Sequence, residues 1–293
     1  MKKGFICFGE VLWDLLPSGK LPGGAPMNVA YHLHTLGSEG KMISRIGEDE
    51  LGKELLAILE EKNISKDLIQ MDATHPTGTV AVTLDAKGSP SYEIVQPVAW
   101  DYIELGSLRE ATANASVFIY GSLAARNETS KNTLLSLLST DALKVLDVNL
   151  RVPFYSQASL EPLLAKANLV KMNEEELEII SEWYAMNVSS EKEQLAFLQN
   201  KFQWTGIILT KGAEGAIFYS NGSLHHQAIF KIKVADTIGS GDAFLAGFLH
   251  NYLQKESIPK CLRLGSFMGA YIATQKGAMP NYRQQDILSN YLG

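Results

Sequence analysis

Cysteine is nearly absent from the 293-residue sequence: Cys7 and Cys261 are its only two, too few for a disulfide framework. Basic residues are not in excess either. The 26 Lys and Arg face 32 Asp and Glu, and the net charge of −6 argues against nucleic-acid or anionic-membrane partners. No apolar run approaches the roughly 20 residues of a membrane-spanning helix, and the N-terminus runs into a strand pattern rather than a signal segment. With 46% hydrophobic residues, we expect a globular cytoplasmic protein with a sizeable core.

Short β-branched runs alternate with helical patterns over most of the chain, which predicts an α/β fold with parallel strands joined by helical crossovers. The strand patterns are apolar enough for a central sheet that is covered on both faces. The predicted strands are Phe5–Phe8, Met42–Ile46, Val117–Tyr120, Val145–Val148, Leu169–Met172 and Ile207–Thr210. Helices are predicted to run from Pro26 to near Gly37 and over Glu174–Tyr184, Glu191–Phe202, Ala243–Leu253 and Ile258–Thr274.

Two stretches rich in Gly, Pro, Thr and Tyr, Gly9–Gly24 and Pro76–Pro97, interrupt this alternation. The second has the pattern of a hairpin, with strands at Thr79–Leu84 and Tyr92–Val95 and a turn at Lys87–Pro90. We interpret both stretches as a small β-sheet lid over one edge of the main domain; an ordinary surface hairpin is the alternative. The predicted boundaries are 1–10, 26–75 and 106–293 for the core and 11–25 and 76–105 for the lid. A second hairpin, Ala216–Ser220 and Leu224–Ala228, is expected to be structural.

Two familiar phosphate-binding motifs are approached but not completed. Gly47–Glu54 comes close to a P-loop, but Glu54 stands where Ser or Thr would hold magnesium, and the acidic residues before it would repel phosphate. We interpret this segment as an acidic turn and a helix start. Gly239-x-Gly241 lacks the third glycine of the dinucleotide fingerprint, because Phe244 stands there, so a dehydrogenase is not expected.

The turn Asp236–Asp242 directly precedes an apolar helix, an arrangement typical of an anion site. The amides of Gly239, Ser240 and Gly241 lack intrahelical partners and can point at a phosphate, together with the positive end of the helix dipole. Two interpretations of Asp242 stay open from these residues. It can be a helix N-cap, or it can be a catalytic base near both an acceptor hydroxyl and a phosphoryl group.

A second element, Gly23–Asn28, places two glycines before a helix whose first turn carries an amide side chain. Its backbone amides and Asn28 are candidates to bind sugar hydroxyls, and the Asp14 carboxylate can accept hydrogen bonds from two vicinal hydroxyls. A plainer role stays open for each residue taken alone, a loop cap for Asn28 and a solvated charge for Asp14.

Gly23–Asn28 and Asp236–Asp242, in this order and at this separation, resemble the two signatures of the ribokinase-type carbohydrate kinase family. The resemblance covers essentially the whole chain and implies a ribokinase-like fold, a mostly parallel sheet between helices with a β lid. It implies that Asp242 is the general base and that the amides of Gly239, Ser240 and Gly241 neutralise developing phosphoryl charge. The residues implied in sugar binding are Asp14, Gly23, Gly24 and Asn28.

The same resemblance implies nucleotide and metal sites. Asn173 to Glu176 resembles an Asn-x-x-Glu element in which Glu176 organises Mg²⁺ through water, although composition alone predicts only a helix N-terminus there. Thr210–Gly215 resembles a loop that lines ATP; its other interpretation is a glycine-rich turn. The implied ATP ligands are Asn173, Thr210, Gly212, Gly215 and Gly241. The implied backbone ligands of a monovalent cation such as K⁺ are Asp236, Ile238 and Gly277.

Four further segments resemble bacterial fructokinases: Phe8–Asp14, Gln96–Asp101, Gly121–Leu123 and Asp147–Arg151. The last makes Arg151 a candidate substrate ligand, and together they imply that ATP phosphorylates the 6-hydroxyl of D-fructose. The alternatives are a kinase of the same family for ribose, a nucleoside or a keto-deoxy sugar acid, and a sugar or nucleotide sensor without catalysis. Lids of this type often pair between subunits, so we expect a homodimer.

Overall fold

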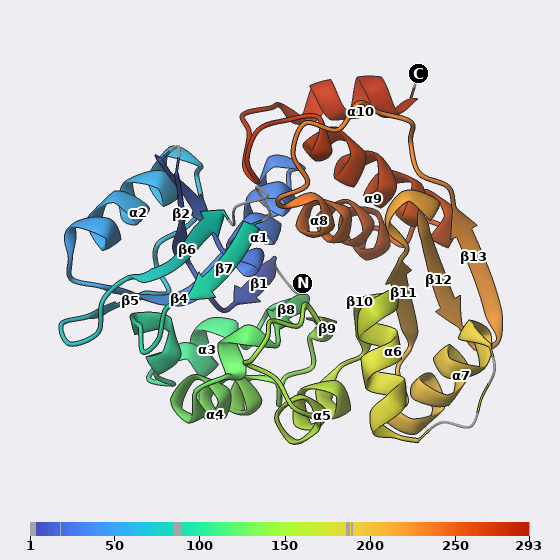
Figure 1. The fold of residues 1–293 in the computed structure, drawn as a ribbon, viewed down its shortest axis with the longest axis horizontal. Coiled ribbons are helices and arrows are strands. Elements are labelled where there is room, and N and C mark those ends of the chain that lie inside the picture. Colours follow the sequence, from blue (N-terminus) through green and yellow to red (C-terminus); the bar gives the residue numbers. More distant parts are fainter. Residues whose placement is uncertain (1–3, 18, 85–89, 186–187, 189, 293) are drawn as a thin grey trace.

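A sheet of nine strands runs across the molecule (Figure 1). The computed structural model describes residues 4–17, 19–84, 90–185, 188 and 190–292, and within them the strand order is β13-β12-β11-β10-β9-β8-β1-β4-β5. The strands from β11 to β5 in that order pair in parallel, whereas β12 and β13 are antiparallel. Their bounds are β1 Phe5–Phe8, β4 Gly40–Gly47, β5 Ile69–Asp72, β8 Val117–Gly121, β9 Leu143–Asp147, β10 Leu169–Asn173, β11 Gly206–Thr210, β12 Ala216–Ser220 and β13 Ser223–Gln227.

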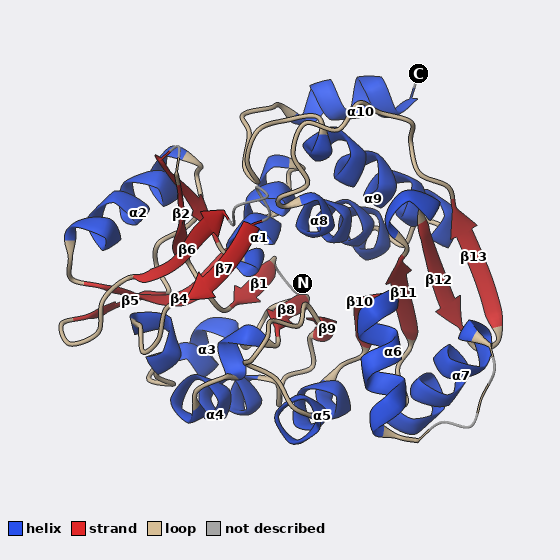
Figure 2. Cartoon of the chain, in the orientation of Figure 1, coloured by secondary structure: helices blue, strands red, loops and turns tan. Residues whose placement is uncertain are grey.

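Helices cover both faces of this sheet, which explains why its central strands are mostly apolar. Figure 2 shows α3, α4 and α5 on one side and α1, α8 and α9 on the other. The predicted strands and helices are confirmed, with ends within three residues of those expected. The helices are α1 Ala25–Thr35, α2 Glu50–Glu61, α3 Leu108–Thr112, α4 Glu128–Leu137, α5 Gln157–Lys166, α6 Glu174–Trp183, α7 Glu191–Phe202, α8 Ser240–Leu253, α9 Ile258–Ala273 and α10 Gln284–Leu292. Among the described residues, no helix is long and apolar enough to cross a membrane.

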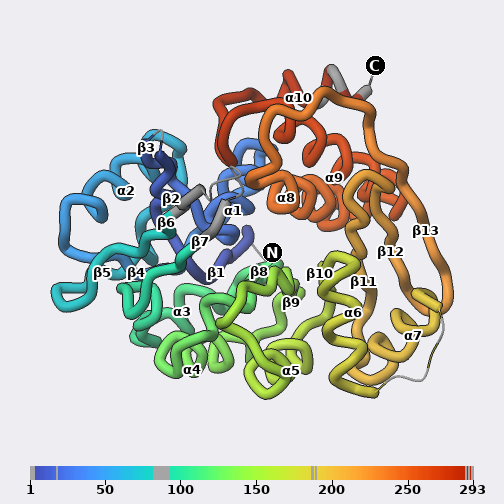
Figure 3. Tube along the Cα trace, viewed as in Figure 1, coloured from blue at the N-terminus to red at the C-terminus, as the bar shows by residue number. Residues whose placement is uncertain are grey.

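A second sheet of four strands lies apart from the helical layers, beside α1 and α2 (Figure 3). Its order is β3-β2-β6-β7, with bounds Gly19–Gly23, Leu12–Leu16, Gly78–Leu84 and Pro90–Ile94. Both stretches that interrupt the alternation therefore meet in one small sheet. The outer pairs are antiparallel, as a hairpin requires, but the central pair β2–β6 is parallel. Residues 87–89 of the predicted turn Lys87–Pro90 lie outside the described residues, and Pro90 begins β7.

The segment Gly47–Glu54 forms the end of β4 and the first turn of α2, as its acidic pattern predicts. Asp49 caps the helix, because its Oδ1 accepts the Gly52 N–H at 2.8 Å. Its Oδ2 accepts the Thr77 N–H at 2.8 Å, which ties the start of α2 to the chain entering β6. Asp49 and Glu50 therefore stand at the start of a helix, as the acidic pattern predicts.

Candidate active site

A cavity of about 620 Å³ opens where the carboxyl ends of the central parallel strands face the four-stranded sheet. Ligands of open α/β sheets usually bind at this end, because loops from several strands converge there. The lining comes from β2, β6 and β7 of the four-stranded sheet, from the ends of β9, β10 and β11, and from the segments that follow β1, β8 and β9. The turn before α8 and the first turns of α1, α6 and α8 complete it. The predicted site residues in this lining are Asp14, Gly24, Asn28, Arg151, Asn173, Glu176, Thr210, Ile238, Gly239, Gly241 and Asp242.

The other predicted site residues, all of them described, are not in the cavity wall. Gly23 lies directly behind Asp14, since a Cβ on this glycine would stand 2.5 Å from Asp14 Oδ2. Gly212 begins a single 3-10 turn after β11, and Gly215 follows it with a φ of 102°. The remaining ones, Ser240, Asp236 and Gly277, belong to the turn before α8 and to the segment that supports it.

Asp242 lies in the first turn of α8, half-buried, and its Oδ2 accepts a hydrogen bond from Asn28 Nδ2 at 2.8 Å. The N-cap of α8 is Gly239, and no side chain caps this helix end. Asp242 is therefore not the N-cap, which was one of its two interpretations. Burial, and then the charge of Asp147, raise the pKa of Asp242 to about 6. A carboxylate with this pKa is still ionised at neutral pH and holds a proton better than an exposed one.

The turn before Asp242 offers fewer free amides than the sequence predicts. The Ser240 N–H donates to Thr237 O at 3.2 Å, so this amide is already engaged. Among the described residues, the amides of Gly239 and Gly241 have no backbone partner outside the helix, and both glycines line the cavity. Gly239 has a φ of 76°, and a Cβ there would stand 2.5 Å from the Ala278 Cβ. The turn therefore requires glycine at 239 and presents two amides at the positive end of α8.

A buried ion pair lies beside this turn and was not predicted from the sequence. Lys171 in β10 places its Nζ 2.8 Å from both carboxylate oxygens of Asp147, at the end of β9, and both residues are buried. Burial lowers the pKa of Lys171, but the Asp147 charge outweighs it and leaves that pKa raised. The Nζ is 3.5 Å from the position of a Cβ on Gly241, so a fixed positive charge stands next to the amide turn. The only signal in the sequence was a charged residue inside an apolar strand.

Asn173 and Glu176 form a capping box at the start of α6. Asn173 Oδ1 accepts the Glu176 N–H at 2.8 Å, and Glu176 Oε2 accepts the Asn173 N–H at 2.9 Å. Glu176 Oε1 also accepts the Leu150 N–H at 2.8 Å. Burial, and then the Asp147 charge, raise the pKa of Glu176. In the described part of the chain, no three His, Cys, Asp or Glu side chains cluster as metal ligands. Because both Glu176 oxygens already accept backbone N–H groups, this carboxylate would reach a divalent cation through water.

The Asp236 carboxylate joins the two segments to which the family resemblance assigns a monovalent cation. Its Oδ1 accepts the Ile238 N–H at 3.0 Å, and its Oδ2 accepts the Gly277 N–H at 3.1 Å. The Asp236 N–H in turn donates to Ala273 O at the end of α9. These hydrogen bonds hold the segment around Gly277 against the turn that precedes α8.

Three carboxyl groups that line the cavity, those of Glu10, Asp14 and Asp242, lie near the Arg151 guanidinium group. Burial raises the pKa of Asp14 to about 6 and that of Glu10 to about 7, and the Arg151 charge opposes both shifts. Asp242 is the third carboxyl that Arg151 influences. Glu10 was not predicted as a site residue; its Oε1 accepts the Ala25 N–H at 3.2 Å and thus caps α1 from outside the helix. Gly24 must be glycine, because a Cβ there would lie 2.3 Å from Glu10 O.

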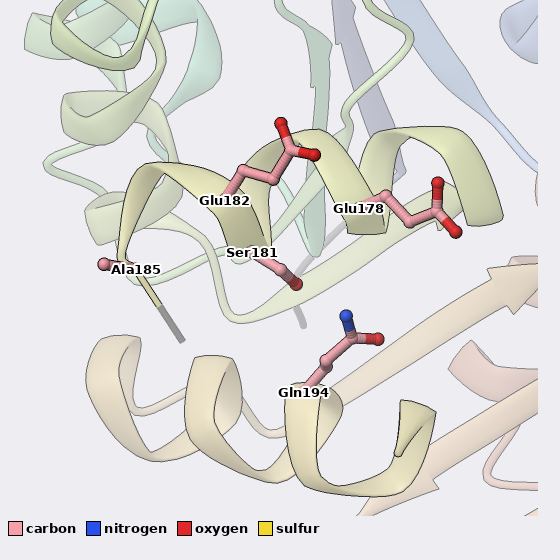
Figure 4. A pocket seen from close by; sticks show the side chains of 5 residues that line it. All are labelled: Glu178, Ser181, Glu182, Ala185 and Gln194. Carbon is pink, nitrogen blue, oxygen red and sulfur yellow. The ribbon is translucent and has the colours of Figure 1, made fainter. Parts of the chain in front are cut away.

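A second hollow of about 390 Å³ lies between α6 and α7, away from this cavity (Figure 4). Its described lining consists of Glu178, Ser181, Glu182, Ala185 and Gln194. Figure 4 shows that Ser181 and Gln194 face each other across it, whereas the Glu182 carboxylate points away. With two carboxylates and no glycine turn, this lining does not suit a phosphate.

A cavity that is lined by an amide turn at a helix N-terminus and by several carboxylates suits a phosphotransferase acting on a small hydroxylated substrate. Residues 18–285 match the model of the pfkB family carbohydrate kinases, and the chain belongs to this family.

Among curated relatives, a fructokinase from Klebsiella pneumoniae is 30% identical over 308 residues, covering 97% of each chain. A fructokinase from Xylella fastidiosa, solved with bound ATP, superposes with a TM-score of 0.87 at 25% identity and covers 99% of this chain and 98% of its own. A fructokinase from Vibrio cholerae covers 100% of this chain and 99% of its own. It was solved with fructose, ADP and calcium (25% identity, TM-score 0.85) and, as a double mutant, with fructose, ADP and potassium (26%, 0.84).

Proposed function

We propose that this chain transfers the terminal phosphoryl group of ATP to the 6-hydroxyl of D-fructose, giving fructose 6-phosphate and ADP. The observation that carries the proposal is the Asp242 carboxylate, which stands between the amide turn of α8 and the Asn28 side chain of α1. The relatives support fructose as the sugar, because the Vibrio cholerae enzyme binds fructose and ADP together.

In the proposed reaction, Asp242 takes the proton of the 6-hydroxyl as its oxygen attacks the phosphorus. The bond from phosphorus to the bridging oxygen of ADP breaks on the opposite side. The Asn28 amide keeps the carboxylate oriented, and the amides of Gly239 and Gly241 with the Lys171 ammonium stabilise the charge that spreads over the phosphoryl oxygens. Because the Ser240 amide is engaged with Thr237, it supports the turn rather than the phosphate.

We propose that Asp14, Asn28 and Arg151 form hydrogen bonds to the sugar hydroxyls. Gly23 and Gly24 allow the backbone to approach the sugar closely. The Asp14 carboxylate is half-buried and lines the cavity, which favours a pair of hydrogen bonds from neighbouring hydroxyls. At the other end, Asn173 and Thr210 reach the phosphates. Gly212 and Gly215 then shape the loop beyond them for the nucleoside.

Magnesium, when bound, neutralises charge on the ATP phosphates, and the Glu176 carboxylate is the group that would hold it through water. We also propose a potassium site formed by backbone oxygens at Asp236, Ile238 and Gly277, since Asp236 already joins these segments. Titration of the metal-free enzyme with Mg²⁺ and with K⁺ tests both ions separately. Unchanged ADP release without added K⁺ would remove the second site.

We propose that segments 11–25 and 76–105 act as a lid that closes over the sugar and excludes water. Support comes from Leu12, Val80 and Ile94, which line the cavity from the four-stranded sheet.

The edge strands of this sheet, β3 and β7, suit pairing with a second copy in a homodimer. Hydrogen exchange with and without fructose tests closure, and sedimentation at micromolar concentration tests the dimer. The cytoplasmic location stays a prediction from composition.

The decisive experiment measures ADP release with fructose, ribose, adenosine and a keto-deoxy sugar acid as acceptors. We expect the largest kcat/KM with fructose. Faster turnover on another member of the panel would reassign the substrate within the family. Binding of fructose and ATP without any ADP release would instead indicate a sensor.

A further inference from the structure

His32 is the residue in α1 whose ring is completely buried yet makes two polar contacts to a distant segment of the chain. Its Nε2 lies 3.0 Å from Ala278 O, and its Nδ1 lies 2.7 Å from the Tyr282 hydroxyl. The exposed fraction of the residue is 0%. Tyr31, the preceding residue, donates from its hydroxyl to Pro280 O. The C-terminal half of this helix therefore contacts the segment 278–282 at three points.

The two contacts of His32 fix its tautomer. A carbonyl oxygen only accepts, so Nε2 carries the hydrogen that it donates to Ala278 O, and Nδ1 accepts from the Tyr282 hydroxyl. Burial lowers the pKa of His32 to about 3, so the ring is neutral and this tautomer is not disturbed near neutral pH. Both hydrogen bonds are consequently directional.

The segment that His32 contacts also packs against the amide turn, residues 236–242 before α8. A Cβ on Gly239 would stand 2.5 Å from the Ala278 Cβ, so the two residues are already in close contact. The neighbouring Gly277 N–H donates to Asp236 Oδ2, at the other end of the same turn. Any shift of Ala278 therefore moves the turn that presents the Gly239 and Gly241 amides.

α1 also carries Asn28, four residues before His32 and so on the same face of the helix. Asn28 bonds to Asp242, as described above, while His32 bonds to the support of the amide turn. One helix thus bonds to Asp242 directly and supports the amide turn through Ala278. An apolar side chain would fill the same space without burying polar atoms, so packing alone does not account for an imidazole here.

Resting on the kinase function proposed above, we propose that His32 is a positioning residue. Through its Nε2–H bond to Ala278 O it sets the distance between the amide turn of α8 and the Asn28–Asp242 pair. The bond from the Tyr282 hydroxyl serves only to hold the ring.

Two amide substitutions separate these bonds while keeping the site neutral and polar. In His32→Gln the side-chain nitrogen can reach the Nε2 position and donate to Ala278 O. In His32→Asn the shorter side chain reaches only the Nδ1 position, so the Ala278 bond is lost. Tyr282→Phe is the matched control, because it removes the Nδ1 contact and leaves the Nε2 contact.

We expect kcat to fall about tenfold or more in His32→Asn, with the KM of fructose within about threefold of wild type, since small misplacements of reacting groups act on the chemical step. His32→Gln and Tyr282→Phe should each keep kcat within about threefold. Hydrogen exchange of residues 236–242 should accelerate in His32→Asn alone. Equal kcat in the Asn and Gln variants, with only a common loss of thermal stability, would overturn the proposal.

Two further outcomes are also informative. If His32→Asn does not fold, a tenfold loss of kcat in folded His32→Gln or Tyr282→Phe would overturn the proposal, because both keep the Ala278 bond. If the wild type releases no ADP with any sugar, the kinase function itself fails. The exchange of residues 236–242 then still decides whether His32 positions the turn.

Discussion

Replacing Asp242 by Asn separates the chemical role of this carboxylate from its role in packing. An amide has nearly the same shape, and its oxygen can accept the hydrogen bond that Asn28 Nδ2 gives at 2.8 Å, so the fold stays intact. It cannot take a proton from a hydroxyl. We therefore expect kcat to fall about 10²–10⁴-fold, which is about 3–5 kcal/mol in activation free energy. The KM of fructose should change by less than about threefold.

The same substitution should stabilise the protein. The pKa of Asp242 is raised from 3.8 to about 6, so between these values the folded state binds more protons than the unfolded chain. Stability is consequently lost as the pH rises through this window, and the loss is complete above it. At about 1.4 kcal/mol per pKa unit, it amounts to at most about 3 kcal/mol. Asp242→Asn carries no charge and recovers this free energy at pH 8 but not at pH 4.

ADP release at saturating ATP and fructose measures kcat, and urea unfolding at pH 8 and pH 4 measures the free energy of unfolding. Asp67→Asn, which removes an exposed carboxylate paired with Lys41, is the control for loss of charge. Wild-type kcat in Asp242→Asn would refute the assignment of the base. A variant that loses both kcat and stability at pH 8 would show that the carboxylate is needed as a structural acceptor instead.

Three further substitutions test the rest of the site. Gly239→Ala forces a Cβ against Ala278, so we expect kcat to fall at least about tenfold and ADP to bind more weakly by calorimetry. Unchanged kcat and ADP affinity would contradict the proposal that the amide turn binds phosphate. Asp14→Asn should raise the KM of fructose at least about tenfold with kcat nearly unchanged, and a fall in kcat alone would argue against sugar binding. Lys171→Met leaves Asp147 buried and unpaired, which should cost about 3–5 kcal/mol in urea unfolding. Adding Asp147→Leu should restore stability but not kcat, and a recovery of kcat would exclude a role for Lys171 in catalysis.

The sequence was sufficient for those parts of the fold that depend on local patterns. β1 and α7 begin and end at the residues that hydrophobic period and turn signals predict, because their apolar faces and their flanking turns agree. The glycines of Asp236–Asp242 likewise marked a turn before a helix. Local patterns did not predict that the Ser240 N–H donates to Thr237 O, because this hydrogen bond depends on the path of the turn.

Contacts between residues far apart in the sequence were beyond such reasoning. Lys171 and Asp147 belong to neighbouring strands, and only the strand order brings their charges together. The strands β2 and β6 pair in parallel although a long stretch of the main domain separates them in the chain. Hairpin signals concern only strands that follow each other directly, so they could not predict this pairing. In the sequence, His32 is simply one residue of an amphipathic helix. Its contact with Ala278, 246 residues further along the chain, is visible only in the structure.

The charges around the cavity also bear on the choice between candidate substrates. Among the residues that line the cavity, Glu10, Asp14 and Asp242 are acidic, and Arg151 is a cation near all three. A neutral polyol can donate hydrogen bonds to these carboxyl groups, whereas the carboxylate of a sugar acid would meet like charges in a partly desolvated site. Lys171, which is paired with Asp147, and the positive end of α8 lie instead at the amide turn that we propose to hold the phosphates. This division of charge favours a neutral sugar such as fructose over a keto-deoxy sugar acid.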